Sequence, residues 1–241
     1  MNKDLINSRF AKTLSTYEEN ALIQKRMAKR LLEFLNKKNF SSILEIGCGT
    51  GLLTKLVNEN LEFEVYKAVD IVSECESYIN NISEKIKFVG ADFEEYLVNS
   101  SERYDLIISN ASLQWAEDFE KTVNVLKSRL NSNGVLLFST FGKENFREIY
   151  HVIGTTLNYY SIKELNLMFD DFSSKIEEEI HIVSFNNPKD VLRHLQATGV
   201  NAIESKSWTK SDLLKFENGY NNLCSRRITL TYNPIYVLIQ N

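Results

Sequence analysis

The 241-residue chain has a formal net charge of −4, and 43% of its residues are hydrophobic and 11% aromatic. This composition can supply a full hydrophobic core, and α/β chains of this length commonly form one domain. The charge gives no global attraction for nucleic acid, because phosphate binding requires clustered lysine and arginine. We therefore expect a single domain over residues 1–241 and no DNA or RNA substrate.

The cysteines and the amino terminus indicate the compartment. Cys48, Cys75 and Cys224 are widely spaced and form no C-x-x-C pair, so they predict neither a disulfide framework nor a zinc site. The amino-terminal segment lacks an apolar signal region, and no apolar run approaches the roughly 18 residues of a membrane span. The sequence therefore predicts a cytoplasmic protein without a metal or a membrane partner.

Strands and helices alternate through the first part of the chain. An amphipathic helix is expected over residues 20–36, where apolar side chains recur at three- and four-residue spacings. Strands are expected at 42–45, 64–69, 87–90, 104–109 and 134–140, with helices following Gly51, near 73–82 and over 119–130. This alternation implies right-handed βαβ crossovers and a parallel sheet.

The pattern loosens beyond residue 143. The expected elements are helices near 143–158 and 161–170, a strand over 179–185, helices beginning at Pro188 and after Thr209 or Ser211, and closing strands at 228–231 and 235–240. We divide the chain into an amino-terminal helical cap (1–40), a cofactor-binding half (41–142) and an acceptor and partner half (143–241).

The stretch from Glu45 to Gly51 lies between a strand and a helix and contains Gly47 and Gly49. Glycines there allow a tight turn and a close approach to a ligand. A dinucleotide fingerprint would place its third glycine at position 52, which is Leu52. A pyrophosphate needs a helix amino terminus, whereas a cofactor without phosphates needs only a glycine floor, so the spacing favours S-adenosylmethionine. Glu45 suits such a sulfonium-bearing zwitterion.

Two further acids follow at strand ends. Asp70 ends the second strand, where a carboxylate can accept both ribose hydroxyls. Asp92 ends the third strand, and with Phe93 it offers an acceptor for an adenine amino group and an apolar face for the ring. Strand-end acids are also common helix caps, so it is their order along the chain that favours a cofactor site. With these acids, E-x-G-x-G-x-G resembles motif I of the class I S-adenosylmethionine-dependent methyltransferases.

Several blocks carry a narrower resemblance that touches nearly the whole chain. They are SNASLQWAEDF, STFGKENFREI, DVLRHLQATGVNAI and LTYNPIYVLIQ, with the early Arg9-Phe10 and Tyr17. Together they resemble the malonyl-acyl-carrier-protein O-methyltransferases of biotin synthesis. The resemblance implies a doubly wound α/β fold with a mostly parallel seven-stranded, Rossmann-like sheet and a helical embellishment in the carboxyl half. It also implies methyl transfer from S-adenosylmethionine to the free carboxylate of malonyl-acyl carrier protein, giving a methyl ester for the pimeloyl stage.

The implied chemistry needs alignment more than proton transfer. A carboxylate with a reference pKa near 4 is already ionised at neutral pH, so no general base is required. Holding the reactants in line contributes up to roughly 7–11 kcal/mol in favourable cases. The chain accordingly shows no Ser/His/Asp pattern and has three histidines.

Candidate residues for the acceptor follow from its charge. A buried carboxylate needs cationic or hydrogen-bonding partners, and Arg147 is the leading candidate, with Arg193 and His194 next. Tyr17 is a candidate for a lid that orients the acceptor oxygen. Each of these also fits a plain structural role, as a solvated helix residue or a packed aromatic.

Two polar residues follow the fourth strand, beside the expected methyl donor. Asn110 and Gln114 are candidates to bind the amino-acid part of the cofactor or the acceptor.

An acidic carrier protein would need a basic docking patch on this acidic enzyme. Two sets of basic residues qualify, one in the carboxyl half and one on the first amphipathic helix: Arg147, Arg193, Lys206, Lys210, Arg226 and Arg227, or Lys25, Arg26, Lys29 and Arg30.

Three alternatives remain open. One is a methyltransferase for a free carboxylic acid such as an aconitate-like acid, which shares the SNASLQW-like block. Another is a cofactor-binding subunit without activity. The third is a nicotinamide oxidoreductase, disfavoured by Leu52.

Overall fold

The computed structural model describes residues 2–170, 173–199, 208–224 and 227–240. A seven-stranded sheet with the order β3-β2-β1-β4-β5-β9-β6 forms its centre. The strands are β1 (Asn39–Ile46), β2 (Glu62–Asp70), β3 (Ile86–Gly90), β4 (Tyr104–Asn110), β5 (Leu130–Phe141), β6 (Ser173–Glu178) and β9 (Pro234–Gln240). Strands β1 to β5 pair in parallel, and β9 runs antiparallel to both β5 and β6. The predicted doubly wound, mostly parallel seven-stranded sheet is confirmed.

The middle strands are apolar because the sheet is covered on both faces. Residues 134–141 of β5 and 234–239 of β9 are buried without a break. Such continuous burial is typical of central strands between two helical layers, where no side chain of the strand meets water.

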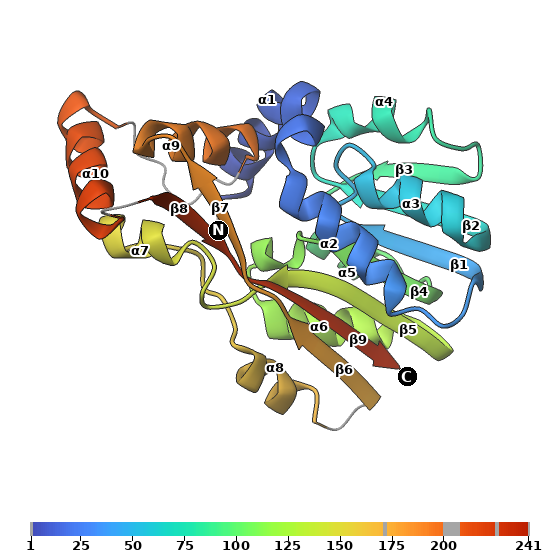
Figure 1. Ribbon diagram of the computed structural model, residues 1–241. Coiled ribbons are helices and arrows are strands. Elements are labelled where there is room, and N and C mark those ends of the chain that lie inside the picture. Colours follow the sequence, from blue (N-terminus) through green and yellow to red (C-terminus); the bar gives the residue numbers. More distant parts are fainter. Residues whose placement is uncertain (1, 171–172, 200–207, 225–226, 241) are drawn as a thin grey trace.

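Helices cover the two faces of the sheet (Figure 1). On one face lie α2 (Leu22–Glu33) and α3 (Leu52–Asn60), and on the other lie α5 (Phe93–Asn99), α6 (Phe119–Ser128) and α8 (Ile162–Met168). The three- and four-residue spacing in α2 places Met27, Ala28 and Leu31 on one buried stripe.

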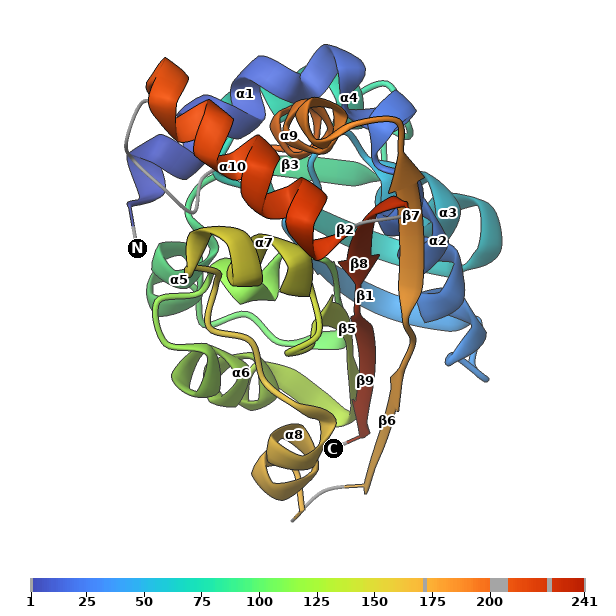
Figure 2. The same cartoon turned by 60° about the vertical axis from the view of Figure 1, so that its left-hand side comes forward.

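A second layer of structure stands beyond the carboxyl ends of the parallel strands (Figures 1 and 2). It consists of α1 (Lys3–Asn20), α7 (Arg147–Ile153), α9 (Pro188–Ala197) and α10 (Lys210–Leu223), with β7 (His181–Phe185) and β8 (Ile228–Tyr232). Strands β7 and β8 form a separate antiparallel pair. The predicted embellishment of the carboxyl half is therefore present, and it contains a small sheet as well as helices.

Some predicted helices are shorter than expected. The segment predicted as a helix near 73–82 is a 3-10 turn (Ser73–Cys75) followed by α4 (Glu76–Ile79). The helix predicted over 143–158 is only α7, which ends at Gly154 with φ of +76°. A left-handed residue at that position stops the helical hydrogen-bond ladder.

Candidate functional site

A cavity opens at the carboxyl ends of β1, β2 and β4, and α1 forms its ceiling. Its empty volume is about 980 Å³ with its mouth included. Open α/β sheets bind ligands at this edge. We call it the first cavity. Every residue predicted as part of the cofactor site lines it except Gly51 and Gln114.

The glycine loop between β1 and α3 forms the floor of the first cavity. Gly47 and Gly49 have φ of +70° and +51°, in the region that glycine adopts without a Cβ penalty. A Cβ on Gly47 would lie 2.1 Å from the Oγ of Ser112, so no larger residue fits there. A Cβ on Gly49 would meet no atom within 4 Å, so its face of the loop is left open.

Asp70 ties the glycine loop to the end of β2. Its Oδ2 accepts the backbone N–H of Gly49 at 2.8 Å, and its Oδ1 accepts that of Val72 at 2.9 Å. Burial raises the pKa of Asp70, and these backbone N–H groups oppose the shift. A carboxylate oxygen has a second lone pair, so Asp70 retains capacity to accept ligand hydroxyls.

Asp92 caps α5 and also holds the amino-terminal helix. Its Oδ1 accepts the backbone N–H groups of Glu94 and Glu95, and Lys3 Nζ lies 2.9 Å from the same oxygen. Lys3 also contacts Glu94 at 3.0 Å. Asp92 therefore does cap a helix, as weighed from the sequence, and none of these contacts uses its Oδ2 atom. Phe93 lines the cavity beside it.

Glu45 differs from its expected role. Its side chain is 1% exposed, and its Oε2 accepts hydrogen bonds from Thr54 Oγ1 at 2.6 Å and Tyr66 OH at 2.5 Å. Burial raises the pKa of Glu45 to about 7, against the effect of these two hydrogen bonds. The group therefore carries a proton for part of the time near neutral pH, which weakens the expected attraction to a sulfonium.

Helix α1 supplies lining residues that the sequence analysis missed. Ile6, Phe10, Thr13 and Leu14 face the first cavity together with the predicted Tyr17. These positions recur at three- and four-residue spacings, so the helical pattern itself would have marked them. The rings of Phe10 and Trp115 pack edge to face, with centroids 5.9 Å apart.

A second cavity of about 340 Å³ adjoins the first. The two share Phe10, Tyr17, Ala111 and Trp115 in their linings. Burial raises the pKa of Tyr17, with Asp70 and Cys75 adding to the shift, so its hydroxyl stays protonated. Tyr17 therefore stands between the two cavities as a neutral hydrogen-bond donor.

Asn110 and Gln114 lie in the linings of different cavities. Asn110 lines the first cavity, but its Nδ2 donates to the backbone oxygen of Gln24, and its Oδ1 accepts from Ser139. Gln114 was predicted with the cofactor residues, and the structure places it in the second cavity and outside the lining of the first. The short helix Leu113–Trp115 carries it there, where its Nε2 donates to Ala111 O at 2.6 Å.

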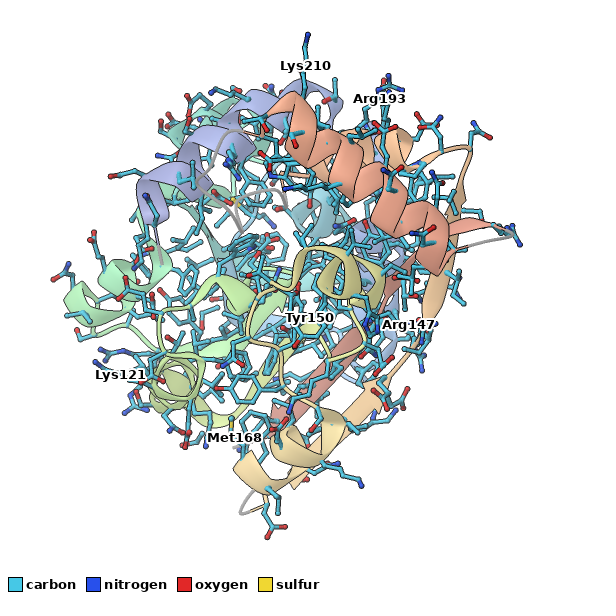
Figure 3. The ribbon with its side chains drawn as sticks, turned by 90° about the vertical axis from the view of Figure 1, so that its left-hand side faces the viewer. Lys121, Arg147, Tyr150, Met168, Arg193 and Lys210 are labelled. Carbon is cyan, nitrogen blue, oxygen red and sulfur yellow. The ribbon has the colours of Figure 1, made fainter. Side chains whose placement is uncertain are left out.

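Arg147 does not line the first or second cavity. Its side chain is 45% exposed, and it pairs with Glu144 at 3.2 Å. Figure 3 shows Arg147 beside α7, on the surface of the carboxyl-half layer. Arg147 lies outside both linings because position 147 begins a helix whose buried residues are its neighbours Glu148 and Ile149. Its predicted role in holding or steering the malonyl group stays a prediction.

Arg193 and His194 occupy opposite sides of α9. Arg193 is 73% exposed and pairs with Asp190, and Figure 3 shows it on the outside of the molecule. His194 is half-buried, and its Nε2 lies 2.6 Å from the hydroxyl of Tyr232. Burial lowers the pKa of His194. His194 thus packs α9 onto β8 and, like Arg193, lies outside the linings of the first and second cavities.

Other expectations concern metals, membranes and the basic patch. Within the described residues, no group of three or more His, Cys, Asp or Glu side chains has an arrangement suited to a metal, and no helix is long and apolar enough to cross a membrane. Arg30, of the patch predicted on the first amphipathic helix, contacts Glu33 and Glu177. Lys206 and Arg226 of the other patch lie outside the described residues.

Comparison with known proteins identifies the class. A family model described as a methyltransferase domain matches residues 19–204. Among solved structures, the YcgJ protein from Bacillus subtilis aligns with a TM-score of 0.62 at 12% identity, over 90% of this chain and 98% of that one. A putative methyltransferase from Bacillus halodurans aligns with a TM-score of 0.63 at 11% identity, over 88% and 97%. The fold and the family model define a methyltransferase.

Curated relatives narrow the class. The malonyl-acyl-carrier-protein O-methyltransferase of Calditerrivibrio nitroreducens is 37% identical over 243 residues, which cover 95% of this chain and 94% of the relative. The protein of the same name from Chlorobium luteolum is 35% identical over 251 residues, covering 99% and 95%. The chain therefore belongs to the malonyl-acyl-carrier-protein O-methyltransferase family, and the predicted family and enzyme class are confirmed.

Proposed function

We propose that this protein transfers a methyl group from S-adenosylmethionine to the free carboxylate of malonyl-acyl carrier protein. The observation that carries the proposal is the junction of two cavities at Phe10, Tyr17, Ala111 and Trp115. The first cavity has the acids and the glycine floor suited to the donor, and the second is largely aromatic. A donor and an acceptor bound in these two spaces meet at the shared residues.

The residues of the first cavity fit S-adenosylmethionine. Asp70 and Asp92 retain oxygen lone pairs for ribose hydroxyls and an adenine amino group, and the open face of Gly49 admits the cofactor against the loop backbone. Phe93 offers the adenine an apolar surface. When bound, this cofactor supplies an electrophilic methyl group on a sulfonium.

The chain's own contribution to the reaction is alignment and exclusion of water. A carboxylate oxygen of the acceptor forms the new O–C bond as the S–C bond breaks, giving the malonyl methyl ester and S-adenosylhomocysteine. No proton moves, so the absence of a base among the shared residues is no obstacle. Tyr17 donates a hydrogen bond to the acceptor and orients it, and Phe10 and Trp115 keep water from the junction.

The relatives support the choice of acceptor, since both are malonyl-acyl-carrier-protein O-methyltransferases. We propose that the product is the methyl ester used at the pimeloyl stage of biotin synthesis. We also propose a cytoplasmic location, where the three free thiols Cys48, Cys75 and Cys224 would stay reduced.

The proposal is tested by incubating the protein with S-adenosylmethionine and malonyl-acyl carrier protein and weighing the carrier by mass spectrometry. We expect the malonyl group to gain one methyl, with one S-adenosylhomocysteine released for each methyl transferred. A Tyr17→Phe variant should bind S-adenosylhomocysteine normally and methylate roughly 10-fold more slowly, as for loss of a hydrogen bond to a charged group. A carrier of unchanged mass after prolonged incubation would refute the proposal.

A further inference from the structure

A third cavity continues the line of the first two. It has an empty volume of about 750 Å³ with its mouth included, and it shares Gln114, Phe141 and Tyr159 with the second cavity. The first, second and third cavities therefore form a continuous series. If the acceptor carboxylate lies at the Tyr17 junction, the rest of the acceptor extends toward Gln114 and Tyr159.

The amide of Asn145 makes the Tyr159 hydroxyl the acceptor in the hydrogen bond between them. Asn233 N donates to Asn145 Oδ1 at 3.2 Å, and a backbone N–H can only donate, so this oxygen assignment of the Asn145 amide is fixed. Asn145 must therefore present its Nδ2 to Tyr159, and it donates to the Tyr159 hydroxyl at 3.0 Å. Tyr159 accepts in that bond, so its own O–H can donate, either into the cavities or to the neighbouring Thr156 hydroxyl, which is buried and has no hydrogen-bond partner among the described residues. Burial raises the pKa of Tyr159 to about 12, which keeps that proton in place.

Gln114 has an acceptor atom without a hydrogen-bond donor. Its Nε2 is occupied by Ala111 O, while its Oε1 is buried and has no hydrogen-bond partner among the described residues. A buried acceptor left without a donor is destabilising, so native proteins seldom leave one without a ligand or water. Gln114 and Tyr159 line the same two cavities, and Gln114 Oε1 lacks a donor while Tyr159 has a hydrogen to donate.

The mouth of the third cavity adds acceptors and negative charge. Glu117 and Asp118 line it, and both are carboxylates. A second carboxylate on the acceptor would be repelled there, whereas a neutral arm carrying N–H groups would be favoured.

We propose that Gln114 and Tyr159 recognise the thioester arm of the acceptor: Tyr159 donates to the thioester carbonyl oxygen, and Gln114 Oε1 accepts the first amide N–H beyond the sulfur. Asn145 is a positioning residue that turns the Tyr159 hydrogen toward the acceptor. This inference rests on the proposed function and deepens it. It explains selection of a carrier-bound malonyl group over a free dicarboxylic acid, which has neither the thioester carbonyl nor the amide N–H.

The experiment varies the substrate and the residue together. Carrier protein is loaded with three malonyl-type arms: the natural arm, an arm with an ester oxygen in place of the first amide N–H, and a thioether arm with a methylene in place of the thioester carbonyl. All three keep the reacting carboxylate. Methylation is followed as kcat/KM by mass spectrometry.

The wild-type enzyme should lose roughly 3- to 10-fold in kcat/KM with either altered arm, the size expected for one neutral hydrogen bond. In Gln114→Met, the ester arm and the natural arm should react equally. In Tyr159→Phe, the thioether arm and the natural arm should react equally. Gln24→Met is the matched control, because Gln24 lines the second cavity without reaching the third, and it should keep the full discrimination.

Asn145→Asp tests the positioning role. The new carboxylate would still accept from Asn233 N, but it would also accept the Tyr159 hydrogen and turn it away from the cavity. We expect Asn145→Asp to lose discrimination against the thioether arm while S-adenosylhomocysteine affinity stays unchanged. In a Tyr159→Phe background the same change should add no further loss of kcat/KM.

The outcomes separate the two proposals. If the wild type does not methylate the natural arm, the proposed function fails. If it methylates all three arms equally, or if Gln114→Met and Tyr159→Phe keep the wild-type discrimination, the function stands and the roles of Gln114 and Tyr159 are refuted.

Discussion

Glu45 shows how a buried carboxyl links stability to pH. Burial raises the pKa of Glu45 from 4.5 to about 7, so between these values the folded state holds a proton that the unfolded state has lost. Stability therefore falls as pH rises through this window and stays low above it. A shift of this size corresponds to about 3 kcal/mol at an order-of-magnitude level.

We expect Glu45→Gln to remove this dependence, because the amide cannot ionise and its oxygen can still accept from Thr54 and Tyr66. The Tm of the variant relative to the wild type should rise between pH 5 and pH 8. The rise should correspond to roughly the same free energy of unfolding. A Tm difference that stays constant across this range would contradict the pKa assigned to Glu45.

Gly49 and Gly154 form a matched pair. Both have positive φ, and a Cβ on either would meet no atom within 4 Å. Gly49→Ala and Gly154→Ala should each lose roughly 1–2 kcal/mol of stability from left-handed strain. Only Gly49→Ala should weaken S-adenosylhomocysteine binding, by about tenfold or more, because only its methyl group projects toward the first cavity. Calorimetric titration measures the S-adenosylhomocysteine affinity of both variants. Equal affinities would show that the cofactor does not approach the loop.

The position of a site residue could be predicted from the sequence where the fold alone determines it. Asp70 and Asp92 reach the first cavity because each lies at or just beyond the end of a parallel strand, and those ends share one edge of the sheet. Arg147 and Gln114 depend instead on how a short helix is turned, which residue spacing does not specify. Partners such as Asn145 and Tyr159 were missed because they lie on irregular chain without periodicity.

At the scale of elements, α1 covers the first cavity, and Lys3 holds its amino end through contacts with Asp92 and Glu94. Burial alone would lower the pKa of Lys3, but its contacts with Asp92 and Glu94 outweigh that effect and raise the pKa to about 12. The charge therefore persists at any working pH, and the contact fastens the helix to the loop that carries Asp92.

We expect Lys3→Met to release S-adenosylhomocysteine several-fold faster, because the helix over the cavity opens more often. Stopped-flow displacement measures this rate. Lys12→Met removes an exposed charge from the same helix and should leave the rate unchanged. Equal rates in the two variants would mean that the Lys3 contact does not hold the cavity closed.

Element prediction succeeded where burial creates a pattern and failed where it does not. The apolar runs of β1, β4 and β5 marked central strands, and Pro188 and Thr209 marked the starts of α9 and α10. Strand β6 was missed because it is an edge strand with the polar sequence SSKIEE, which pairs with β9 on one side only. Its hydrogen bonds come from tertiary context, and its own side chains give no period-two signal.

At the scale of the whole molecule, the topology followed from the sequence and the line of cavities did not. Five predicted strands with helices between most of them leave few arrangements once crossovers are right-handed. The cavities lie between α1, the glycine loop and the chain around Asn145 to Tyr159, which are far apart in the sequence. Their alignment depends on long-range packing that no local pattern encodes.

The central claim is that the second and third cavities are built for a carrier-bound carboxylate. The most direct measurement supplies malonyl-acyl carrier protein, free malonate and an aconitate-like free acid together in one reaction and compares their kcat/KM values by mass spectrometry of the products. Our account predicts that the carrier-bound malonyl group is methylated at least about 100-fold more efficiently than either free acid, since the free acids lose the two arm contacts and meet Glu117 and Asp118. Equal or greater efficiency with a free acid would contradict the account.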